Sequence, residues 1–426
     1  MNWNQVCHGG LVVGALALRH EEPDLAAAIV YRALINIPRA VAVCEPDGAY
    51  PEGPSYWEFG TSYTVFLIEA LETALGTDFG LASLPGFQSS AAFMLHATGP
   101  TGLTFNFADS HASRRNSPTL YWFARRFGAL ALPAAPESTI WQGHPEALGR
   151  GDMGILSPLW HVCYAPPAVP PAALPLDCAF RGPMPVLMFR SSWADTNALY
   201  LAVKAGSPGG NHGHMDGGSF VLEANGVRWA FDLGAENYYR AEATGMDFWD
   251  RKQTGDRWRF FRQGASSHNT LVIDGGQQRV DGAARVVTFR DDADTPSATV
   301  DLTELYAGQA ASVVRTFTLP HRRQVVVADR LTGLKPGSLV RWAMVTPADA
   351  TPAGDMVTLR RGAKLLHVAA AAATPVTWQV SDLAQPPHTF DSPNPGYRLI
   401  SFEVVAPANG ALAWEVSFTP EAERNP

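Results

Sequence analysis

Cysteine is scarce in this sequence, which contains four residues of this type among 426, at Cys7, Cys44, Cys163 and Cys178. They are widely scattered and form no C-x-x-C pair, so the sequence suggests neither a zinc knuckle nor a dense disulfide framework. We interpret them as small buried hydrophobic side chains, which leaves the redox compartment undecided.

Charge and long apolar runs are also limited. Charged residues make up 17% of the chain and the formal net charge is -8, which argues against general nucleic-acid binding but is compatible with a local basic cleft for an acidic polymer. We find no apolar run long enough to span a bilayer, and the N-terminus lacks the basic and apolar regions of a secretory signal. These features predict a soluble protein without a membrane or nucleic-acid partner, and they do not distinguish a periplasmic from a cytoplasmic location.

Hydrophobic residues account for 46% of the sequence, which predicts an ordinary globular chain, and the length of 426 residues predicts two or three domains. Up to about residue 165 the pattern is helical, with an apolar segment at Gly10–Leu18 and helices predicted at Asp24–Leu34, Ser62–Leu75 and Leu120–Phe127. Residues 166–185 form a proline-rich connector, the best domain boundary in the chain. We therefore predict a multidomain α+β protein, with a helical domain at 1–165 and a sheet domain at 186–426.

After the connector the period changes to alternation, which predicts many short strands and a large antiparallel sandwich. The predicted strands are Val186–Arg190, Ala198–Lys204, Phe220–Glu223, Val227–Phe231, Thr270–Ile273, Arg285–Arg290, Ala298–Leu302, Val313–Leu319, Gln324–Asp329, Leu339–Thr346, Met356–Leu359, Lys364–Val368, Pro375–Val380, Arg398–Val405 and Leu412–Phe418.

A polar segment rich in glycine and proline lies within the helical half, from Pro46 to Gly60. It carries Tyr56, Trp57 and Glu58, and aromatic rings beside carboxylates suit sugar binding in a functional loop. The alternative is that Tyr56 and Trp57 only anchor this loop on the helical core.

The stretch from Asn211 to Asp232 carries the densest chemical signal. His212 and His214 are two residues apart, so on a strand both rings leave the same face. An Asn-Gly turn at residues 225–226 predicts a hairpin that brings Asp232 back beside His214. With His268 of the S-S-H-N-T segment, these side chains form the nitrogen and oxygen ligand set that suits zinc or a similar divalent ion. The alternative is that the histidines are polar loop residues and that Asp232 caps a strand.

Five motifs in order resemble the heparinase II/III-like polysaccharide lyases, which include alginate, heparin and heparan lyases. They are N-W-N-Q-V-C, P-D-G-A-Y-P-E-G-P-S-Y-W-E-F-G, N-H-G-H-M-D-G-G-S-F, W-A-F-D-L-G and S-S-H-N-T-L, and they extend from Asn2 beyond Leu271. The resemblance implies an (α/α) toroid followed by an antiparallel β-sandwich, with the active site in the cleft between them. It also implies cleavage of an acidic polysaccharide or oligosaccharide that contains uronic acid by β-elimination, which leaves an unsaturated uronyl product.

The resemblance assigns roles residue by residue. It implies that His214, Asp232 and His268 hold zinc and that His212 points toward the substrate carboxylate. Tyr56 matches the family's catalytic acid or base, and Asn2 matches an asparagine that neutralises the uronate carboxyl group.

Further candidates follow from the chemistry. Because enolate charge develops on the uronate carboxyl group when its α proton is removed, neutral or positive donors are needed there, and Arg190 is a further candidate beside Asn2 and His212. Tyr238 or Tyr239 would supply a second phenol, although packing at the sheet edge explains them equally well. We also assign substrate contact to Asn4, Trp57, Glu58 and Arg190.

The sequence departs from the family at two points. The asparagine is often followed by histidine in the family, whereas Trp3 follows it here, so Asn4 is the substitute neutralising group or there is none. Longer members begin their toroid well upstream of this motif, so we expect a partial helical domain or first helices supplied from outside this chain.

Two other functions remain open. One is a metal-dependent glycan hydrolase or oxygenase with an open metal position. The other is an acidic-glycan-binding protein that has kept the fold and lost the chemistry. The sequence does not distinguish the polymer, endo from exo cleavage, or the oligomeric state.

Overall fold

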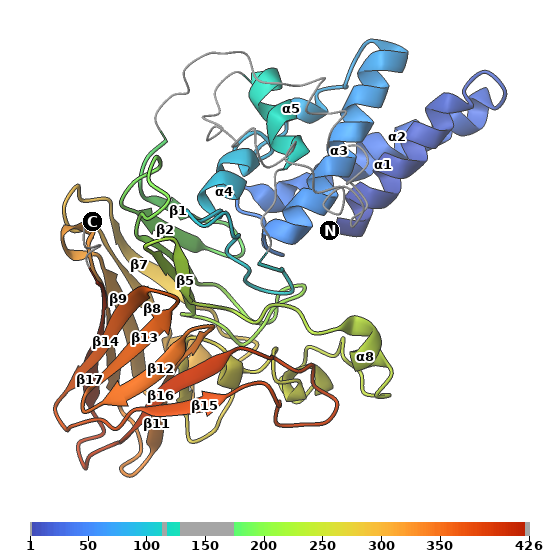
Figure 1. Cartoon of the computed structure of the whole chain (residues 1–426). Helices are drawn as coiled ribbons and strands as arrows, with labels where there is room; N and C mark the ends of the chain where they lie inside the picture. The colour runs from blue at the N-terminus through green and yellow to red at the C-terminus, as the bar shows by residue number, and fades with distance from the viewer. Residues whose placement is uncertain (1, 113–116, 128–173, 422–426) are drawn as a thin grey trace. The chain divides into compact units, whose positions relative to one another are not determined.

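The computed structural model describes residues 2–112, 117–127 and 174–421 (Figure 1). The described residues fall into two compact units. The helical unit contains residues 2–97, 117–127, 174–175 and 180–182, and the sheet unit contains residues 98–112, 176–179 and 183–421. The predicted change from helix to strand along the chain is therefore confirmed.

The helical unit consists of five helices and two short 3-10 turns in the part of the chain that the structure describes. They are α1 (Asn2–Ala17), α2 (Pro23–Val41), η1 (Ala42–Cys44), α3 (Pro54–Leu75), η2 (Leu81–Ser83), α4 (Ser90–His96) and α5 (Pro118–Phe127). Helix α1 packs on both α2 and α3. A Cβ atom at Gly9 would lie 2.5 Å from the carbonyl oxygen of Tyr63, so glycine permits the close approach of α1 and α3.

The start of α3 corrects the loop predicted from Pro46 to Gly60. Gly53 has a φ of 88° and Pro54 occupies the first helical turn, a combination that starts a helix because proline is pre-set for this position. Tyr56, Trp57 and Glu58 therefore lie on α3 and not in a loop.

One helical stretch, Pro23–Cys44, is long and apolar enough to cross a membrane by length and composition, which corrects the sequence-based expectation that no such run exists. A third of its most apolar window is buried inside the protein. Core helices of soluble proteins can have the same length and composition, so this feature is weak evidence for a membrane span.

The sheet unit is built from three antiparallel sheets. The five-stranded sheet has the order β1 (Cys178–Phe180), β2 (Val186–Arg190), β3 (Tyr200–Lys204), β4 (Phe220–Ala224), β5 (Val227–Ala230). The four-stranded sheet has the order β15 (Gln379–Asp382), β16 (Arg398–Val405), β11 (Leu339–Thr346), β6 (Leu271–Ile273). The eight-stranded sheet has the order β12 (Asp349–Ala353), β13 (Met356–Arg361), β14 (Lys364–Ala372), β17 (Leu412–Pro420), β10 (Val325–Thr332), β9 (Ser312–Thr318), β8 (Ser297–Asp301), β7 (Arg285–Arg290).

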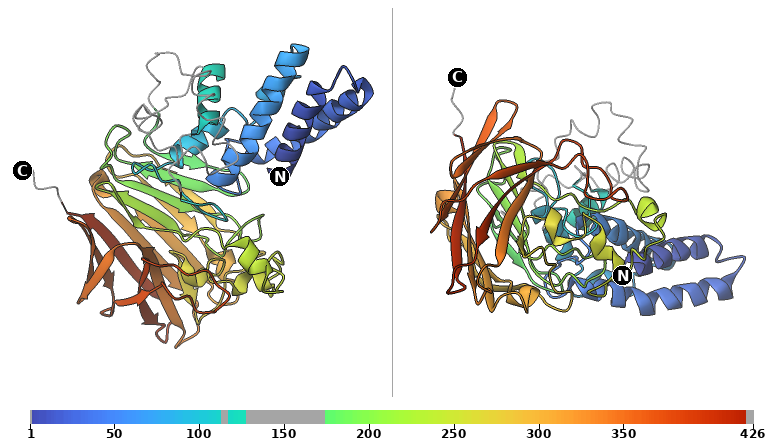
Figure 2. Two further views of the ribbon diagram at one scale, coloured as in Figure 1. Left: turned by 45° about the vertical axis from the view of Figure 1, so that its right-hand side comes forward. Right: turned by 90° about the horizontal axis from the view of Figure 1, so that it is seen from below.

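One buried apolar cluster contains side chains from all three sheets. Figure 2 shows the strands of these sheets from two further sides. The ring of Phe220 on β4 lies 5.9 Å from that of Phe317 on β9 and 5.8 Å from that of Phe418 on β17, and Trp342 on β11 lies 6.3 Å from Phe418. The two smaller sheets therefore share a core with the eight-stranded sheet, which removes large aromatic areas from water.

All predicted strands except one overlap the observed strands closely. The exception is Pro375–Val380, since β15 starts only at Gln379. Strands β1 and β12 were not predicted. Strand β12 contains Pro352, and its position at the edge of its sheet explains why proline is tolerated there.

The domain boundaries need one correction. Residues 98–112 were predicted to belong to the helical domain but are part of the sheet unit. Residues 128–173 lie outside the described residues. They comprise the last part of the predicted helical domain, up to residue 165, and the first part of the predicted connector. Cys163 lies there as well.

Candidate functional site

The hairpin predicted around Asn225 and Gly226 is present. Their φ angles of 53° and 71° are those of a type I′ turn, and β4 pairs with β5 in antiparallel register. The chain beyond β5 then carries Asp232, whose backbone carbonyl accepts a hydrogen bond of 2.8 Å from Asn106.

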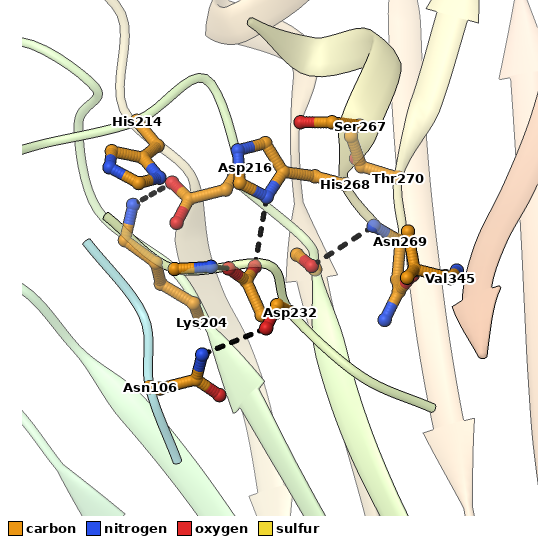
Figure 3. Close-up of polar contacts among 12 residues, drawn as sticks. Asn106, Lys204, His214, Asp216, Asp232, Ser267, His268, Asn269, Thr270 and Val345 are labelled. Carbon is orange, nitrogen blue, oxygen red and sulfur yellow. Dashed lines mark hydrogen bonds and ion pairs between the residues drawn. The ribbon is translucent and has the colours of Figure 1, made fainter. Parts of the chain in front are cut away.

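The three side chains predicted to bind a metal converge on one point. His214, Asp232 and His268 are all buried and each offers a ligand atom within 4.8 Å of the others (Figure 3). His268 Nδ1 lies 2.8 Å from Asp232 Oδ2, while the other carboxylate oxygen of Asp232 accepts from the Gly234 amide at 2.8 Å.

Two imidazole nitrogens in this group have no hydrogen-bond partner among the described residues. They are Nδ1 of His214 and Nε2 of His268, both buried. Because buried polar atoms are nearly always satisfied, unpartnered nitrogens beside a carboxylate fit a site for a divalent cation.

The pKa values of the cluster follow from burial and charge. Burial lowers the pKa of His214, and the Asp109 carboxylate offsets this only in part. Burial also opposes the charged form of His268, but the Asp232 carboxylate outweighs it and raises the pKa of His268. The reciprocal effect of His268 overcomes burial and lowers the pKa of Asp232.

Asp109, which the sequence analysis did not single out, connects the histidines. Its Oδ1 accepts from His214 Nε2 at 2.8 Å, and its Oδ2 lies 2.9 Å from His212 Nδ1 and 2.8 Å from the Tyr238 hydroxyl. Arg257 donates to the same Oδ2 at 3.0 Å. Burial alone raises the pKa of Asp109, but Arg257 and the two histidines hold it well below its ordinary value.

His212 and Tyr238 form the exposed side of this cluster. Tyr238 starts the short helix α8 (Tyr238–Glu242), and its ring stacks on His212 with centroids 6.2 Å apart and its hydroxyl 3.1 Å from His212 Nδ1. The edge of Trp249 packs on both rings. An imidazole and a phenol at hydrogen-bond distance are a pair of groups that can exchange protons.

A second buried ion pair lies beside the metal ligands. Lys204 on β3 contacts Asp216, two residues after His214, and both side chains are buried (Figure 3). The pair was not predicted, although the H-x-H-x-D spacing was visible in the sequence.

Two predicted residues of the sheet unit do not join the site. The side chain of Tyr239 is 85% exposed, whereas the hydroxyl of its neighbour Tyr238 contacts Asp109. Arg190 pairs with Tyr200, at the opposite end of β2 from the residue that pairs with Lys204. It stacks on Trp193 and donates to the carbonyl of Thr98, and burial lowers its pKa to about 10. Its assigned contact with substrate at the His212 cluster is therefore not supported.

The amide side chains predicted in the helical unit contact neighbouring helices. Asn2 is buried and donates to the backbone carbonyl of Tyr56 at 3.0 Å. Asn4 donates to the carbonyl of Asn36 at 3.2 Å. The side chain of Tyr56 is partly exposed on α3.

Trp57 and Glu58 face the helical core. Trp57 is fully buried against Phe123, which contradicts its assignment to substrate contact and favours the anchoring alternative. Glu58 is also buried and accepts from Thr119 at 3.2 Å. The burial of Trp57 and Glu58 follows from their place on α3, because one face of this helix packs on the helical core, whereas a loop has no fixed buried face.

The comparisons with known proteins agree with the fold. Residues 189–398 match the family model described as heparinase II/III-like, C-terminal, and no curated protein matches the chain. The solved heparan sulfate lyase HepC mutant from Pedobacter heparinus is 16% identical with a TM-score of 0.72, over 98% of this chain and 60% of that chain.

Two solved heparinase III structures are similarly related. One is 13% identical with a TM-score of 0.69, over 96% of this chain and 60% of its own. The other, a heparinase III gene product, is 14% identical with a TM-score of 0.67, over 96% of this chain and 59% of that chain. At these identities the likeness concerns the fold, and the chain spans about 60% of the length of the solved structures it matches. Residues 189–398 of the protein are thus a heparinase II/III-like C-terminal domain.

Proposed function

We propose that the protein is a polysaccharide lyase that cleaves an acidic polysaccharide containing uronic acid by β-elimination. The observation that carries the proposal is the pair of His212 and Tyr238, both hydrogen-bonded to the carboxylate that also holds His214. The family supports a glycosaminoglycan-type substrate, since solved relatives are named as heparan sulfate lyase and heparinase III.

The proposed reaction consumes no water. A base removes the proton on C5 of the uronate, the electron pair forms the C4=C5 double bond, and the C4–oxygen bond breaks. An acid then returns a proton to the leaving glycosidic oxygen. We assign the base and acid roles to Tyr56 with Tyr238 as the second phenol, and we assign donation to the developing carboxylate charge to His212 and Asn2.

His214, Asp232 and His268 would hold zinc in this scheme. The two unpartnered imidazole nitrogens and the adjacent carboxylate fit such an ion. When bound, zinc would supply a fixed positive charge that holds these loops together and so keeps His212 in position.

We further propose that the helices of the first unit are part of an (α/α) toroid and that the three sheets form the family's β-sandwich. The shared core beneath the sheets supports the second of these assignments.

The test is a panel of heparan, heparin, chondroitin and alginate chains, followed by the ultraviolet absorbance of the new C=C bond. We expect product from at least one polymer, and we expect Tyr56→Phe to lower kcat by at least ~100-fold with an unchanged melting temperature. Tyr31→Phe is the matched control, since Tyr31 is 66% exposed on α2.

Two results would contradict the proposal. New reducing ends without ultraviolet absorbance would indicate the metal-dependent hydrolase, and binding of uronate oligomers without turnover would indicate a glycan-binding protein. A fully active Tyr56→Phe variant would remove Tyr56 from the mechanism.

A further inference from the structure

The side chain of Asp109 is fully buried yet accepts hydrogen bonds from five different side chains. His214 and Gln263 donate to Oδ1 at 2.8 and 3.3 Å. His212, Tyr238 and Arg257 share the acceptor Oδ2, at 2.9, 2.8 and 3.0 Å. A buried carboxylate with this many donors is ionised, and it accepts hydrogen bonds but donates none.

The hydrogen bonds to Asp109 determine which nitrogen of each histidine carries the proton. Because the carboxylate only accepts, His214 donates to it from Nε2, which leaves the lone pair on Nδ1, the atom that has no partner. For the same reason His212 donates from Nδ1, and its lone pair is on Nε2.

The backbone around Asp109 is fixed to the same cluster. Ala108 has a φ of 56°, and the amide of Asp109 donates to the carbonyl of His212 at 3.2 Å. Asn106, three residues earlier, donates to the carbonyl of Asp232 at 2.8 Å. One short segment thus contacts a predicted metal ligand and His212 through both side chain and backbone.

We propose that Asp109 is a positioning residue that links the metal site to the catalytic pair by setting both tautomers: His214 binds zinc through Nδ1, and His212 acts through Nε2. The inference about His214 depends only on the three predicted metal ligands, whereas the inference about His212 rests on the proposed function. We call these the metal half and the catalytic half. Carboxylates that orient a metal-bound histidine typically change metal affinity 10- to 100-fold when they are removed.

The direct test is Asp109→Asn. An amide of the same shape keeps one acceptor, which Arg257 requires, and turns a donor toward His214 Nε2. The ring must then carry its proton on Nδ1, where it blocks the ligand atom, as a carboxylate-to-amide change imposes the wrong tautomer in catalytic triads. We expect the zinc Kd, measured by competition with a chromogenic chelator, to rise by at least ~10-fold.

The matched control is Asp177→Asn. Asp177 is also a buried carboxylate, and it is paired with Arg322 in the same unit. A purely structural effect would lower the melting temperature of both variants and leave both zinc affinities alike. An unchanged zinc Kd in Asp109→Asn would therefore overturn the proposal.

Two further measurements keep the metal and catalytic halves separate. In the wild-type protein, nitrogen NMR of the histidine rings should show a proton on Nε2 of His214 and on Nδ1 of His212, and the opposite tautomers would overturn the inference even if Asp109→Asn does not fold. If no polysaccharide is cleaved by the wild type, the proposed function fails, while the zinc and tautomer measurements still decide the metal half.

Discussion

Tyr238 and Tyr239 are adjacent in sequence but have opposite surroundings. The hydroxyl of Tyr238 donates to Asp109 at 2.8 Å, whereas Tyr239 is 85% exposed. We expect Tyr238→Phe to lower kcat about 100-fold with little effect on KM, because its hydroxyl belongs to the acid–base pair and not to a substrate anchor. Tyr239→Phe should behave as wild type. Equal activities of the two variants, measured by ultraviolet product formation, would contradict this assignment.

At the scale of single residues, the sequence predicted what depends on short spacing. His212 and His214 are two residues apart, and a recognisable turn brings Asp232 back to them. Asp109 was missed because its contacts span 103 to 154 residues, and a lone aspartate in a loop carries no signal for such contacts. The helix was predicted from Ser62 onward, but α3 starts at Pro54, so the buried positions of Trp57 and Glu58 were missed.

Asn269 joins three strands at the point where the smaller sheets meet. Its amide nitrogen donates to the carbonyls of Phe220 and Phe231 at 2.7 and 3.0 Å, and its side-chain oxygen accepts from the amide of Val345 at 2.7 Å (Figure 3). The S-S-H-N-T segment thus contributes a predicted metal ligand, His268, and next to it a connection between β4, β11 and the end of β5.

We expect Asn269→Ala to lower the free energy of unfolding by about 3 kcal/mol, because it removes hydrogen bonds to three backbone groups, two of them in buried contacts. Urea unfolding followed by circular dichroism measures this loss. Asn409→Ala is the control, since Asn409 is exposed and its side-chain oxygen accepts from the amide of Ala411. A loss below about 1 kcal/mol for Asn269→Ala would show that these bonds are replaced by water.

At the scale of elements, alternation predicted nearly every strand but not how the strands associate. The hairpin of β4 and β5 was predictable because Asn225 and Gly226 favour its turn. The orders of the sheets were not, because pairs such as β14 with β17 join segments separated by more than 40 residues. Strand β12 shows the limit of propensity, since an edge position tolerates a proline that the pattern alone excludes.

The composition of the chain predicted its division into a helical and a sheet unit, apart from one segment. Residues 98–112 precede the connector in sequence but belong to the sheet unit, where Arg228 donates to the carbonyls of Leu103 and Thr104. Polar loop composition does not reveal which unit a segment joins. The consequence is functional, because this segment supplies Asp109.

All three predicted metal ligands belong to the sheet unit, which makes the thermal stability of the whole molecule informative. A ligand that binds only the folded state at 100 times its Kd stabilises that state by about 2.7 kcal/mol. For a unit of this size we expect zinc to raise the melting temperature by ~5–10 °C and a chelator to reverse the shift. The melting temperature can be measured by near-ultraviolet circular dichroism, to which Trp342 and its aromatic neighbours in the sheet core contribute.

His214→Ala is the control for this experiment, because it removes one of the three ligands and should abolish the response to zinc. It should also lower the stability of the metal-free protein, because the His214 ring is buried and its Nε2 donates to Asp109 at 2.8 Å. A wild-type protein whose melting temperature is indifferent to zinc and chelator would contradict the metal assignment. A response that persists in His214→Ala would instead place the ion elsewhere in the chain.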